Sequence, residues 1–373
     1  MNGCFDKARG KLGFGFMRLP MTGDEVNYTE LNKMVDTFMD AGFNYFDTAH
    51  GYVGGKSEIA LRESLVLRYP RESYLIADKL SAPHFNKEEE IRPLFEAELA
   101  ACGVDYFDYF LMHAQDKDNF AKYKRCRAYE IAFELKEEGR VRHVGISFHD
   151  EPSLLERILT EYPALEFVQI QLNYADYEDA SVQSRKCLEV CRAHGKPAIV
   201  MEPVKGGTLV KLPEEAEAIF RALGDASTAS YAIRFAAGCE GVAMVLSGMG
   251  SVAMVEDNVG YMKDFKPLSD EEMDAVRRVC DIFRSGADIP CTDCRYCMEN
   301  CPKNIPIPAI FACLNSQKNF HYWNTKYYYG IHTDGKGKAS DCIGCGKCER
   351  ACPQHLKIRE LLGRAVAEFE TKK

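Results

Sequence analysis

The stretch from Phe43 to Leu80, FNYFDTAHGYVGGKSEIALRESLVLRYPRESYLIADKL, contains the unit from which most of this chain is built. A β-rich run (43–49) is followed by an amphipathic helical run (56–68) and then by a second β-rich run (73–80). Two strands joined through a helix are typical of a parallel sheet, because a parallel pair needs a long crossover connection. The stretch therefore predicts a βαβ unit.

The same alternation runs from about residue 10 to residue 265. Seven β-rich runs are clear, and a further one, the first in the chain, fits only loosely at residues 11–16. Eight such strands predict a (β/α)8 TIM barrel, whereas a doubly wound open sheet is the alternative. Both the barrel and the open sheet belong to the α/β class. Besides the runs above, the β-rich runs lie at 106–113, 143–149, 167–174, 198–204 and 242–249, and helical runs lie at 91–103, 129–139, 153–162 and 181–195.

Composition excludes several classes of partner. Of the 373 residues, 46% are hydrophobic, which is enough apolar material for a large core. A formal net charge of −9 without a basic stripe argues against a nucleic-acid partner. The chain has no run of about 18 apolar residues, and its start lacks the apolar core of a secretion signal. We therefore expect no membrane partner and a cytoplasmic location.

The sixteen cysteines are distributed unequally along the chain. Eight are scattered singly, as buried core thiols usually are. The other eight form two matched runs, CTDCRYCMENCP (Cys291–Pro302) and CIGCGKCERACP (Cys342–Pro353), with the C-x-x-C-x-x-C-x-x-x-C-P spacing of bacterial two-cluster ferredoxins. In a cytoplasmic protein such runs predict metal ligands rather than disulfides. We expect two [4Fe-4S] clusters rather than zinc sites or inert thiols.

In this spacing three thiolates of one run hold a cluster and the fourth reaches the other cluster. The first cluster is expected on Cys291, Cys294, Cys297 and Cys352, and the second on Cys342, Cys345, Cys348 and Cys301. A helix over 269–285, capped by Ser269, and a linker, SGADIP, precede the first cysteine run. We expect a barrel at 1–287 and, at 288–373, a small α+β ferredoxin-like domain that ends in a helix.

Ionisable residues lie at or near the ends of three successive β-rich runs. These residues are Asp47, Lys79 and His113, and Tyr52 follows Asp47 by five residues in a short loop. The carboxyl ends of barrel strands form one rim, where barrel enzymes keep their active sites, so the four side chains are expected to converge. Each one alone is more often a structural group, but four at adjacent strand ends favour a catalytic site.

These four side chains suit proton donation to a carbonyl oxygen. A tyrosine, with an ordinary pKa of about 10, is too weak an acid by itself near neutrality. Lys79 beside Tyr52 would favour the phenolate, and Asp47 would hold that lysine in place. His113 would hydrogen-bond the substrate oxygen. Tyr52 is therefore the expected general acid.

The region from about residue 11 to residue 265 resembles the aldo/keto reductase family in the order and spacing of its motifs. The segments that carry the resemblance are LGFGFMRLP (12–20), NYFDTAHGY (44–52), YLIADKL (74–80), YFLMH (109–113), GISFHD (145–150), VQIQLNY (168–174), PVKGGTL (203–209) and LSGMGSVAMVEDNV (246–259). The resemblance implies a (β/α)8 barrel and NAD(P)H-dependent carbonyl reduction. Asp47, Tyr52, Lys79 and His113 match the family's catalytic tetrad. The whole chain resembles the branch that carries a C-terminal dicluster ferredoxin domain.

The same resemblance implies where the nicotinamide cofactor is held. Ser147 and Gln169 match positions that hold the carboxamide, and Asn258 matches one that faces the adenine. Phe148 and Met201 depart from the residues usual in the family near the nicotinamide. The other positions expected to contact the cofactor are Gly206, Gly207, Ser247, Gly248 and Gly250.

The loop GMGSVA (248–253) leads into a helix and is the expected phosphate site, because free N–H groups at a helix start face an anion. Residues 247–259 contain no Lys or Arg that could pair with a 2′-phosphate. We therefore expect NAD(P)H as cofactor, with no strong preference for NADP.

The sequence thus predicts an oxidoreductase that moves hydride between NAD(P)H and a carbonyl or alcohol substrate (an aldehyde, a ketone or a sugar), with clusters for structure or for electron exchange with a partner such as a ferredoxin. In the rival interpretation, the cluster domain is an electron carrier or redox sensor, and the barrel binds nucleotide without turnover. A proton donor favours the enzyme, since a nucleotide sensor needs none. The aromatic run HYWNTKYYYG (321–330) is expected to pack against the barrel rather than to line the substrate pocket.

Overall fold

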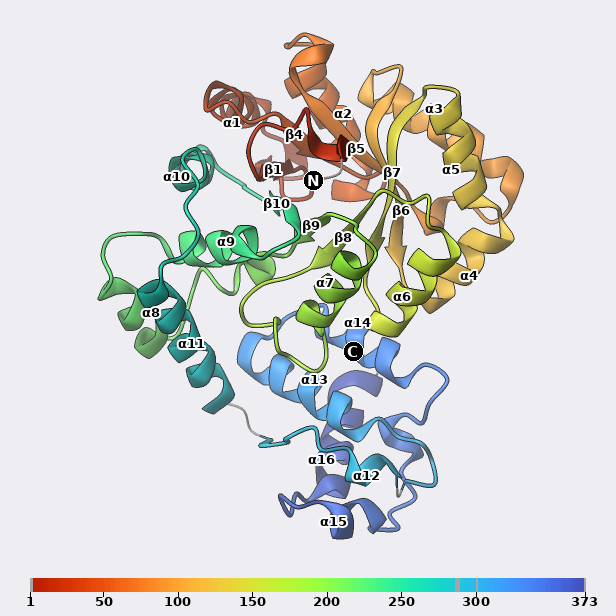
Figure 1. Cartoon of the computed structure of the whole chain (residues 1–373), viewed down its shortest axis with the longest axis vertical. Helices are drawn as coiled ribbons and strands as arrows, with labels where there is room; N and C mark the ends of the chain where they lie inside the picture. Colours follow the sequence, from red (N-terminus) through yellow and green to blue (C-terminus); the bar gives the residue numbers. More distant parts are fainter. Residues whose placement is uncertain (1–2, 286–288, 300, 372–373) are drawn as a thin grey trace.

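The computed structural model describes residues 3–285, 289–299 and 301–371 and contains a closed barrel of eight parallel strands (Figure 1). Their order around the barrel is β1-β10-β9-β8-β7-β6-β5-β4. The barrel prediction is confirmed, the loosely placed first strand included, and the open sheet is wrong. The barrel strands are β1 (Leu12–Gly15), β4 (Tyr45–Asp47), β5 (Leu75–Leu80), β6 (Phe107–Gln115), β7 (Val141–Phe148), β8 (Phe167–Gln171), β9 (Ala198–Met201) and β10 (Val242–Ser247).

Helices surround this barrel, and a two-stranded antiparallel hairpin, β2 (Met21–Thr22) and β3 (Glu25–Val26), follows β1. The helical run expected over 56–68 is divided, because a π-helical turn over Arg62–Val66 follows α2. No described helix combines the length and the apolar composition that crossing a bilayer requires. The helices are α1 (Tyr28–Asp40), α2 (Ser57–Leu61), α3 (Ile91–Cys102), α4 (Lys117–Arg125), α5 (Ala128–Glu137), α6 (Pro152–Glu161), α7 (Ser184–Ala193), α8 (Glu214–Arg221), α9 (Thr228–Gly238), α10 (Val252–Met262) and α11 (Asp270–Ser285).

The amino-terminal end of the barrel is closed by the start of the chain. Phe5 stacks on Tyr109 inside the barrel with ring centroids 5.1 Å apart, and the Tyr109 hydroxyl donates a hydrogen bond of 2.8 Å to the carbonyl oxygen of Cys4. Tyr45 and Phe167 belong to the same buried cluster. Because this end is filled with side chains, a ligand site is left to the opposite end, where the strands finish.

The second unit, called the module below, contains only helices in its described residues, 289–299 and 301–371. The expected α+β composition is therefore wrong for this part of the chain. The cysteine runs contain only two- or three-residue spacers, with residues such as Asp293 and Arg295 at positive φ, so they form turns and short helices instead of strands. The module helices are α12 (Tyr296–Glu299), α13 (Ile307–Phe320), α14 (Thr325–Thr333), α15 (Lys347–Ala351) and α16 (Ile358–Ala365).

The predicted terminal helix is present as α16, which packs with α13 in the module's own apolar core. Ser269 caps α11 as predicted, since its hydroxyl accepts a hydrogen bond of 3.2 Å from the N–H of Glu272. The expected boundary between residues 287 and 288 lies outside the described residues. In Figure 1 the module lies below the barrel, with α13 and α14 nearest to it.

The module contacts the barrel where the barrel strands end. Gln171, the last residue of β8, is buried, and its side-chain oxygen accepts hydrogen bonds from Asn324 (3.2 Å) and from the Tyr328 hydroxyl (3.1 Å). Asn324 and Tyr328 belong to the aromatic run, so the prediction that this run packs against the barrel is confirmed. Trp323 of the same run is 63% exposed and adds little to this contact.

A buried ion pair lies under the same contact. Lys205 Nζ is 2.5 Å from Asp176 Oδ1, and both side chains are almost fully buried. The rings of Phe320 and Tyr322 from the module lie 4.9 and 5.1 Å from the ammonium, within the range of cation–π attraction. The Gln171 amide donates to the other oxygen of Asp176 at 2.8 Å. The pair therefore belongs to a polar network that joins barrel and module.

Replacing Lys205 by Met should leave the buried Asp176 carboxylate without its cation. We expect a loss of about 3 kcal/mol or more in the free energy of unfolding, measured by urea denaturation of anaerobic, cluster-loaded protein. The matched control is Arg277→Met, whose pair with Asp274 is exposed and should contribute much less. Equal losses in the two variants would contradict a structural role for the buried pair.

Candidate active site and cluster cavities

Asp47 and Lys79 meet at the rim as predicted. Both side chains point into the barrel from the ends of neighbouring strands, β4 and β5, and are 3% and 0% exposed. Lys79 Nζ donates hydrogen bonds of 2.6 Å to Asp47 Oδ1 and to the carbonyl oxygen of Thr48. Desolvation is the largest influence and lowers the pKa of Lys79, but the interactions with Asp47, Tyr52 and Asp78 together outweigh it, so the pKa is raised and the lysine stays charged.

His113 reaches the same place because β6 is irregular at its end. The pairing of β6 with β7 shifts register between Met112 and Gln115, and Ala114 adopts a positive φ of 50°. Such a bulge re-aims the side chains next to it. The His113 ring lies edge-on to Tyr52 with centroids 5.7 Å apart, and its Nδ1 is 2.7 Å from the Ser81 hydroxyl. Desolvation and the nearby Lys79 charge hold the pKa of His113 well below its usual value, so the ring is neutral.

Tyr52 begins the short 3-10 turn Tyr52–Gly55, in which Val53 and Gly54 have positive φ. Lys79 Nζ lies 4.9 Å from the Tyr52 ring centroid, so all four predicted residues are brought together. Desolvation raises the pKa of Tyr52 above 10, and Lys79 only partly offsets this rise. The ground state is therefore a phenol next to an ammonium group. Sequence reasoning anticipated the effect of Lys79 but not the larger effect of burial.

Ser147, near the end of β7, and Gln169, in the middle of β8, lie side by side, and their Cα atoms are register partners. The Ser147 hydroxyl accepts a hydrogen bond of 2.7 Å from the N–H of Ala114. Gln169 is 3% exposed, its amide nitrogen is 3.6 Å from Met201 Sδ, and its oxygen has no hydrogen-bond partner in the described structure. An unpaired buried amide oxygen is costly, so this position suits a ligand that donates a hydrogen bond. Phe148 instead belongs to the apolar layer outside the barrel.

Glycines expected to contact the cofactor lie around the side chain of Arg18. Arg18, in the loop after β1, lies 3.2 Å (Cδ) and 3.4 Å (Nη2) from where side chains would begin at Gly248 and Gly206. The neighbouring Gly207 and Gly250 lie in the same two loops, after β9 and β10. Gly206 and Gly207 have positive φ, which favours glycine. The arginine is exposed, and between the two loops it could contact a bound anion.

The sequence predicts free backbone N–H groups at the start of α10, but two of these groups already have acceptors within the protein. The Val252 N–H donates to Glu30 Oε1 at 3.0 Å, and the Met254 N–H donates to the capping Ser251 hydroxyl. These donors are thus already used within the protein. Ser247 and Asn258, both buried, are bonded to each other, with the hydroxyl donating to the amide oxygen at 2.7 Å. Arg18 is therefore a stronger anion-binding candidate than the helix start.

The eight cysteines of the two runs line two small open cavities, four cysteines in each. Each cavity takes three cysteines from one run and one from the other, which is the crossed arrangement that the spacing predicts. Apolar side chains such as Ile307 make up much of the remaining lining. Cys291, Cys294, Cys297 and Cys352 line one cavity, and Cys301, Cys342, Cys345 and Cys348 line the other. All sixteen cysteines are free thiols.

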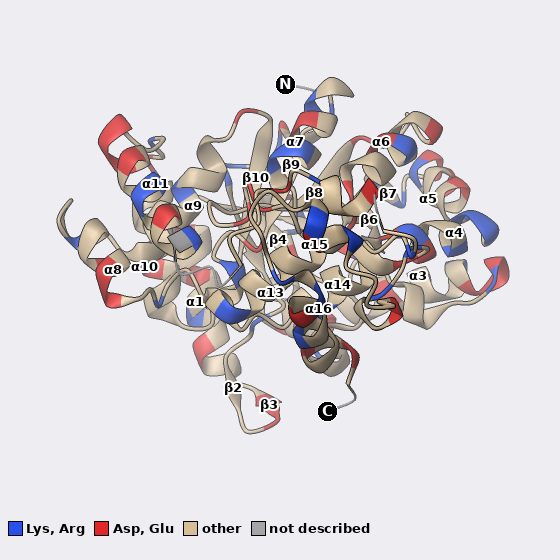
Figure 2. Ribbon diagram, turned by 90° about the horizontal axis from the view of Figure 1, so that it is seen from below, with Lys and Arg blue, Asp and Glu red and all other residues tan. Residues whose placement is uncertain are grey.

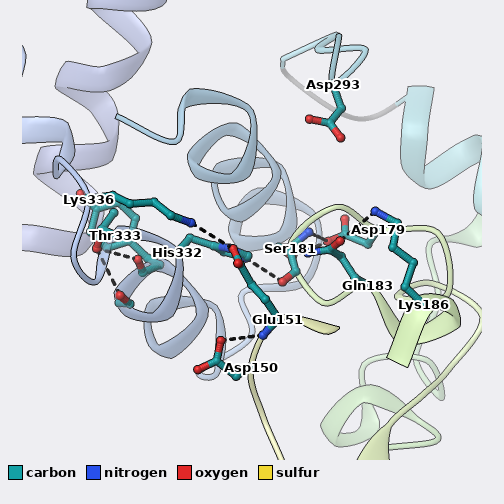
Figure 3. Close-up of polar contacts among 12 residues, drawn as sticks. Asp150, Glu151, Asp179, Ser181, Gln183, Lys186, Asp293, His332, Thr333 and Lys336 are labelled. Carbon is teal, nitrogen blue, oxygen red and sulfur yellow. Dashed lines mark hydrogen bonds and ion pairs between the residues drawn. The ribbon is translucent and has the colours of Figure 1, made fainter. Parts of the chain in front are cut away.

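A second polar contact joins the module to the barrel rim (Figure 3). His332 of α14 is buried between Glu151, which follows β7, and Ser181, which follows β8. Its Nε2 is 2.7 Å from the Ser181 carbonyl oxygen and its Nδ1 is 3.2 Å from Glu151 Oε1. Lys336 also pairs with Glu151 at 3.3 Å. The hydrogen bond from His332 is the main reason that the pKa of Glu151 is lowered to about 2.

Sequence reasoning missed Arg18 and the network around Gln171. Arg18 lies in the quoted motif LGFGFMRLP, but only the fold brings that loop beside residues more than 180 positions later. An amide at a strand end carries no signal of its own, so Gln171 could have been noticed only from its place at the end of β8. These contacts connect elements far apart in the sequence.

Comparison with known proteins agrees with the two units. The model of the aldo/keto reductase family matches residues 11–281, and that of the 4Fe-4S dicluster domain matches residues 290–357. The NADH-specific methylglyoxal reductase of Escherichia coli is 28% identical over 195 residues, which cover 47% of this chain and 57% of that protein. The L-galactose dehydrogenase of Arabidopsis thaliana is 25% identical over 277 residues, covering 69% and 85%.

Solved structures share the barrel. An aldo-keto reductase from Bacillus halodurans superposes with a TM-score of 0.58 and 23% identity over 72% of this chain and 91% of that one. One from Klebsiella pneumoniae, in complex with NADPH, has a TM-score of 0.58 and 19% identity over 72% and 90%. At these identities the structures support the fold alone. With the family model matching from the first strand to α11, this chain belongs to the aldo/keto reductase family.

Proposed function

We propose that this protein transfers hydride between NAD(P)H and a small carbonyl or alcohol substrate, with Tyr52 as the general acid. The observation that carries the proposal is the meeting of a phenol, a charged lysine and a neutral histidine at the open end of the barrel. When bound, the nicotinamide supplies the hydride. Aldehydes, ketones and sugars are the proposed substrate class.

The protein's own residues would provide the proton. Tyr52 is a phenol in the ground state and can donate its proton to the carbonyl oxygen. Lys79, held charged by Asp47, would stabilise the phenolate that remains. The neutral His113 can donate a hydrogen bond to the same oxygen without competing for the proton. In the direction of alcohol oxidation the phenolate would accept the proton.

The Tyr52→Phe variant should reduce NAD(P)H-dependent carbonyl reduction by at least about 100-fold, because it removes the acid and little volume. Cofactor affinity should change little. A panel of aldehydes, ketones and sugars, assayed anaerobically, measures turnover, and fluorescence titration measures binding. Tyr28→Phe, on the outer face of α1, is the matched control. Near-normal turnover in Tyr52→Phe would remove this residue from the mechanism.

The cofactor proposal rests on the positions around the rim. Gln169 and Ser147 would hold the carboxamide, since the Gln169 oxygen lacks a donor. Arg18 would contact the pyrophosphate, with Gly206, Gly207, Gly248 and Gly250 leaving room for it, while Ser247 and Asn258 would lie toward the adenine. Residues 247–259 still offer no basic side chain for a 2′-phosphate, so no strong NADP preference is proposed.

Replacing Arg18 by Leu should weaken NADH and NADPH binding by similar factors of about tenfold or more, because both share the pyrophosphate. Equilibrium titration of both cofactors measures this. Arg277→Leu, an exposed change on α11, should leave both affinities unchanged. A loss confined to NADPH would assign Arg18 to the 2′-phosphate instead, and a hundredfold NADPH preference in the unaltered protein would contradict the proposed lack of selectivity.

For the module we propose two [4Fe-4S] clusters, one in each cavity. Four thiols around a cavity with apolar walls are the donor set of such a cluster. The crossed sets of three cysteines from one run and one from the other favour two clusters over zinc ions, because this is the ligand pattern of two-cluster ferredoxins. The domain boundary is proposed between residues 287 and 288. A cytoplasmic location is proposed as well, because a reducing compartment keeps cysteines available as metal ligands.

Anaerobically purified protein should contain about eight iron and eight sulfide per chain. Cys352→Ser and Cys291→Ser should each remove the same spectroscopic component, although these residues are 61 positions apart. Cys301→Ser should remove the other component. Cys239→Ser, an isolated thiol, is the control. Zinc without sulfide, or a Cys352→Ser variant that matches Cys301→Ser, would contradict the assignment.

The clusters are proposed to exchange electrons with an acidic carrier such as a ferredoxin, or to stabilise the module, and not to take part in hydride transfer. Residues 288–373 contain thirteen Lys or Arg and nine Asp or Glu, against a net charge of −9 for the whole chain. Figure 2 looks onto this side and shows basic residues on α15, near the exposed Cys345. The rival function, a redox sensor without turnover, would leave Tyr52 and Lys79 without a purpose.

A further inference from the structure

Three carboxyl groups meet between the barrel and its helices, apart from the proposed active site. Asp78 precedes Lys79 on β5, and because strand side chains alternate, it points outward where Lys79 points inward. Glu58 from α2 and Glu98 from α3 reach the same place. The three residues are 0%, 1% and 0% exposed, in a layer that is otherwise apolar. Neither the tetrad nor the cofactor positions include them.

The contacts within this cluster leave Glu98 without a partner. One carboxyl oxygen of Glu58 and one of Asp78 lie within 4.8 Å of each other, and Cys102 Sγ donates to Asp78 Oδ2 at 3.5 Å. His50 Nδ1 is 3.0 Å from Glu58 Oε2. Both carboxyl oxygens of Glu98 are buried without a hydrogen-bond partner in the described structure. A buried carboxyl group in this state needs compensation.

A nearby buried aspartate shows how the protein compensates such a group elsewhere. Asp108 on β6 is paired with Arg71 at 2.6 Å and with Arg142 at 3.1 Å. Within the part of the chain that the structure describes, no Lys or Arg forms an ion pair with Glu58, Asp78 or Glu98.

The geometry points to a binding site for one first-row divalent cation, with His50, Glu58 and Glu98 as its ligands. One imidazole nitrogen and one oxygen from each glutamate lie within 4.8 Å of one another. Ligand atoms bound at about 2.1 Å lie roughly 3.0–3.5 Å apart, so small side-chain rotations suffice. The His50 side chain is 28% exposed and provides access from solvent.

Asp78 and Cys102 lie behind the proposed ligands as positioning residues. With Glu58 they form a second group whose ligand atoms are within 4.8 Å of one another. Cys102 donates to Asp78, which lies beside Glu58, and outer partners of metal ligands commonly take such places. His50 lies in the loop between Asp47 and Tyr52, so a cation here would tie that loop to α2 and α3. This inference does not depend on the proposed hydride transfer.

The test is titration of cluster-loaded, oxidised protein with Mn²⁺, followed by the loss of the free-ion spin-resonance signal. Mn²⁺ prefers oxygen and nitrogen ligands and so avoids the cysteine cavities. We expect about one Mn²⁺ per chain and its displacement by Zn²⁺, which binds such ligands more tightly. Glu98→Gln should weaken binding by at least about tenfold. Glu96→Gln, an exposed change on the same helix, should leave it unchanged.

A thermal shift provides an independent readout. Mn²⁺ should raise the melting temperature of the unaltered protein and of Glu96→Gln, but not that of Glu98→Gln, because a ligand stabilises the state that binds it. If Glu98→Gln does not fold, His50→Gln, at a partly exposed position, replaces it in both measurements. Absence of stoichiometric Mn²⁺ binding, or binding that survives both substitutions, would overturn the proposal and leave the carboxyl groups as protonated core residues.

Discussion

Two geometric constraints act together throughout this structure: a closed parallel barrel brings all strand ends to one rim, and side chains along each strand alternate between inside and outside. On β5 they place Lys79 in the barrel and Asp78 in the surrounding layer. Burial of Lys79 is tolerable because Asp47, on the next strand, lies within 2.6 Å. Asp78 and Lys79 are thus neighbours in the sequence but belong to two separate polar clusters. A shift of β5 by one residue would turn Asp78 into the barrel and Lys79 into the surrounding layer.

The other end of the barrel has no such role, because Phe5 and Tyr109 fill it. The rim is open to ligands only where the module leaves it uncovered, since α14 bonds to the end of β8 and to the loops after β7 and β8. Buried polar contacts of this kind define one orientation of the two units, because a misplaced module would leave Gln171 and Glu151 without their partners. The module is therefore part of the architecture of the rim.

Much of the fold could be predicted from the sequence, because it depends on local patterns. The alternation of runs predicts the barrel, the strand ends predict the meeting of Asp47, Lys79 and His113, and the cysteine spacing predicts the crossed cavities. Contacts between distant segments could not be predicted in this way. Arg18 beside Gly248 and Tyr328 on Gln171 depend on loop paths that periodicity does not encode. The roles of the site residues and the contacts to a cofactor remain predictions.

The crossed lining of the two cavities has a consequence for the order in which the chain acquires its shape during synthesis. Each cavity needs cysteines from both runs, and the second run begins 51 residues after the first, with α14 between them. A ribosome has therefore released the whole barrel sequence before either cavity can be completed. On the nascent barrel the end of β8 therefore stays uncovered until α14 has been made.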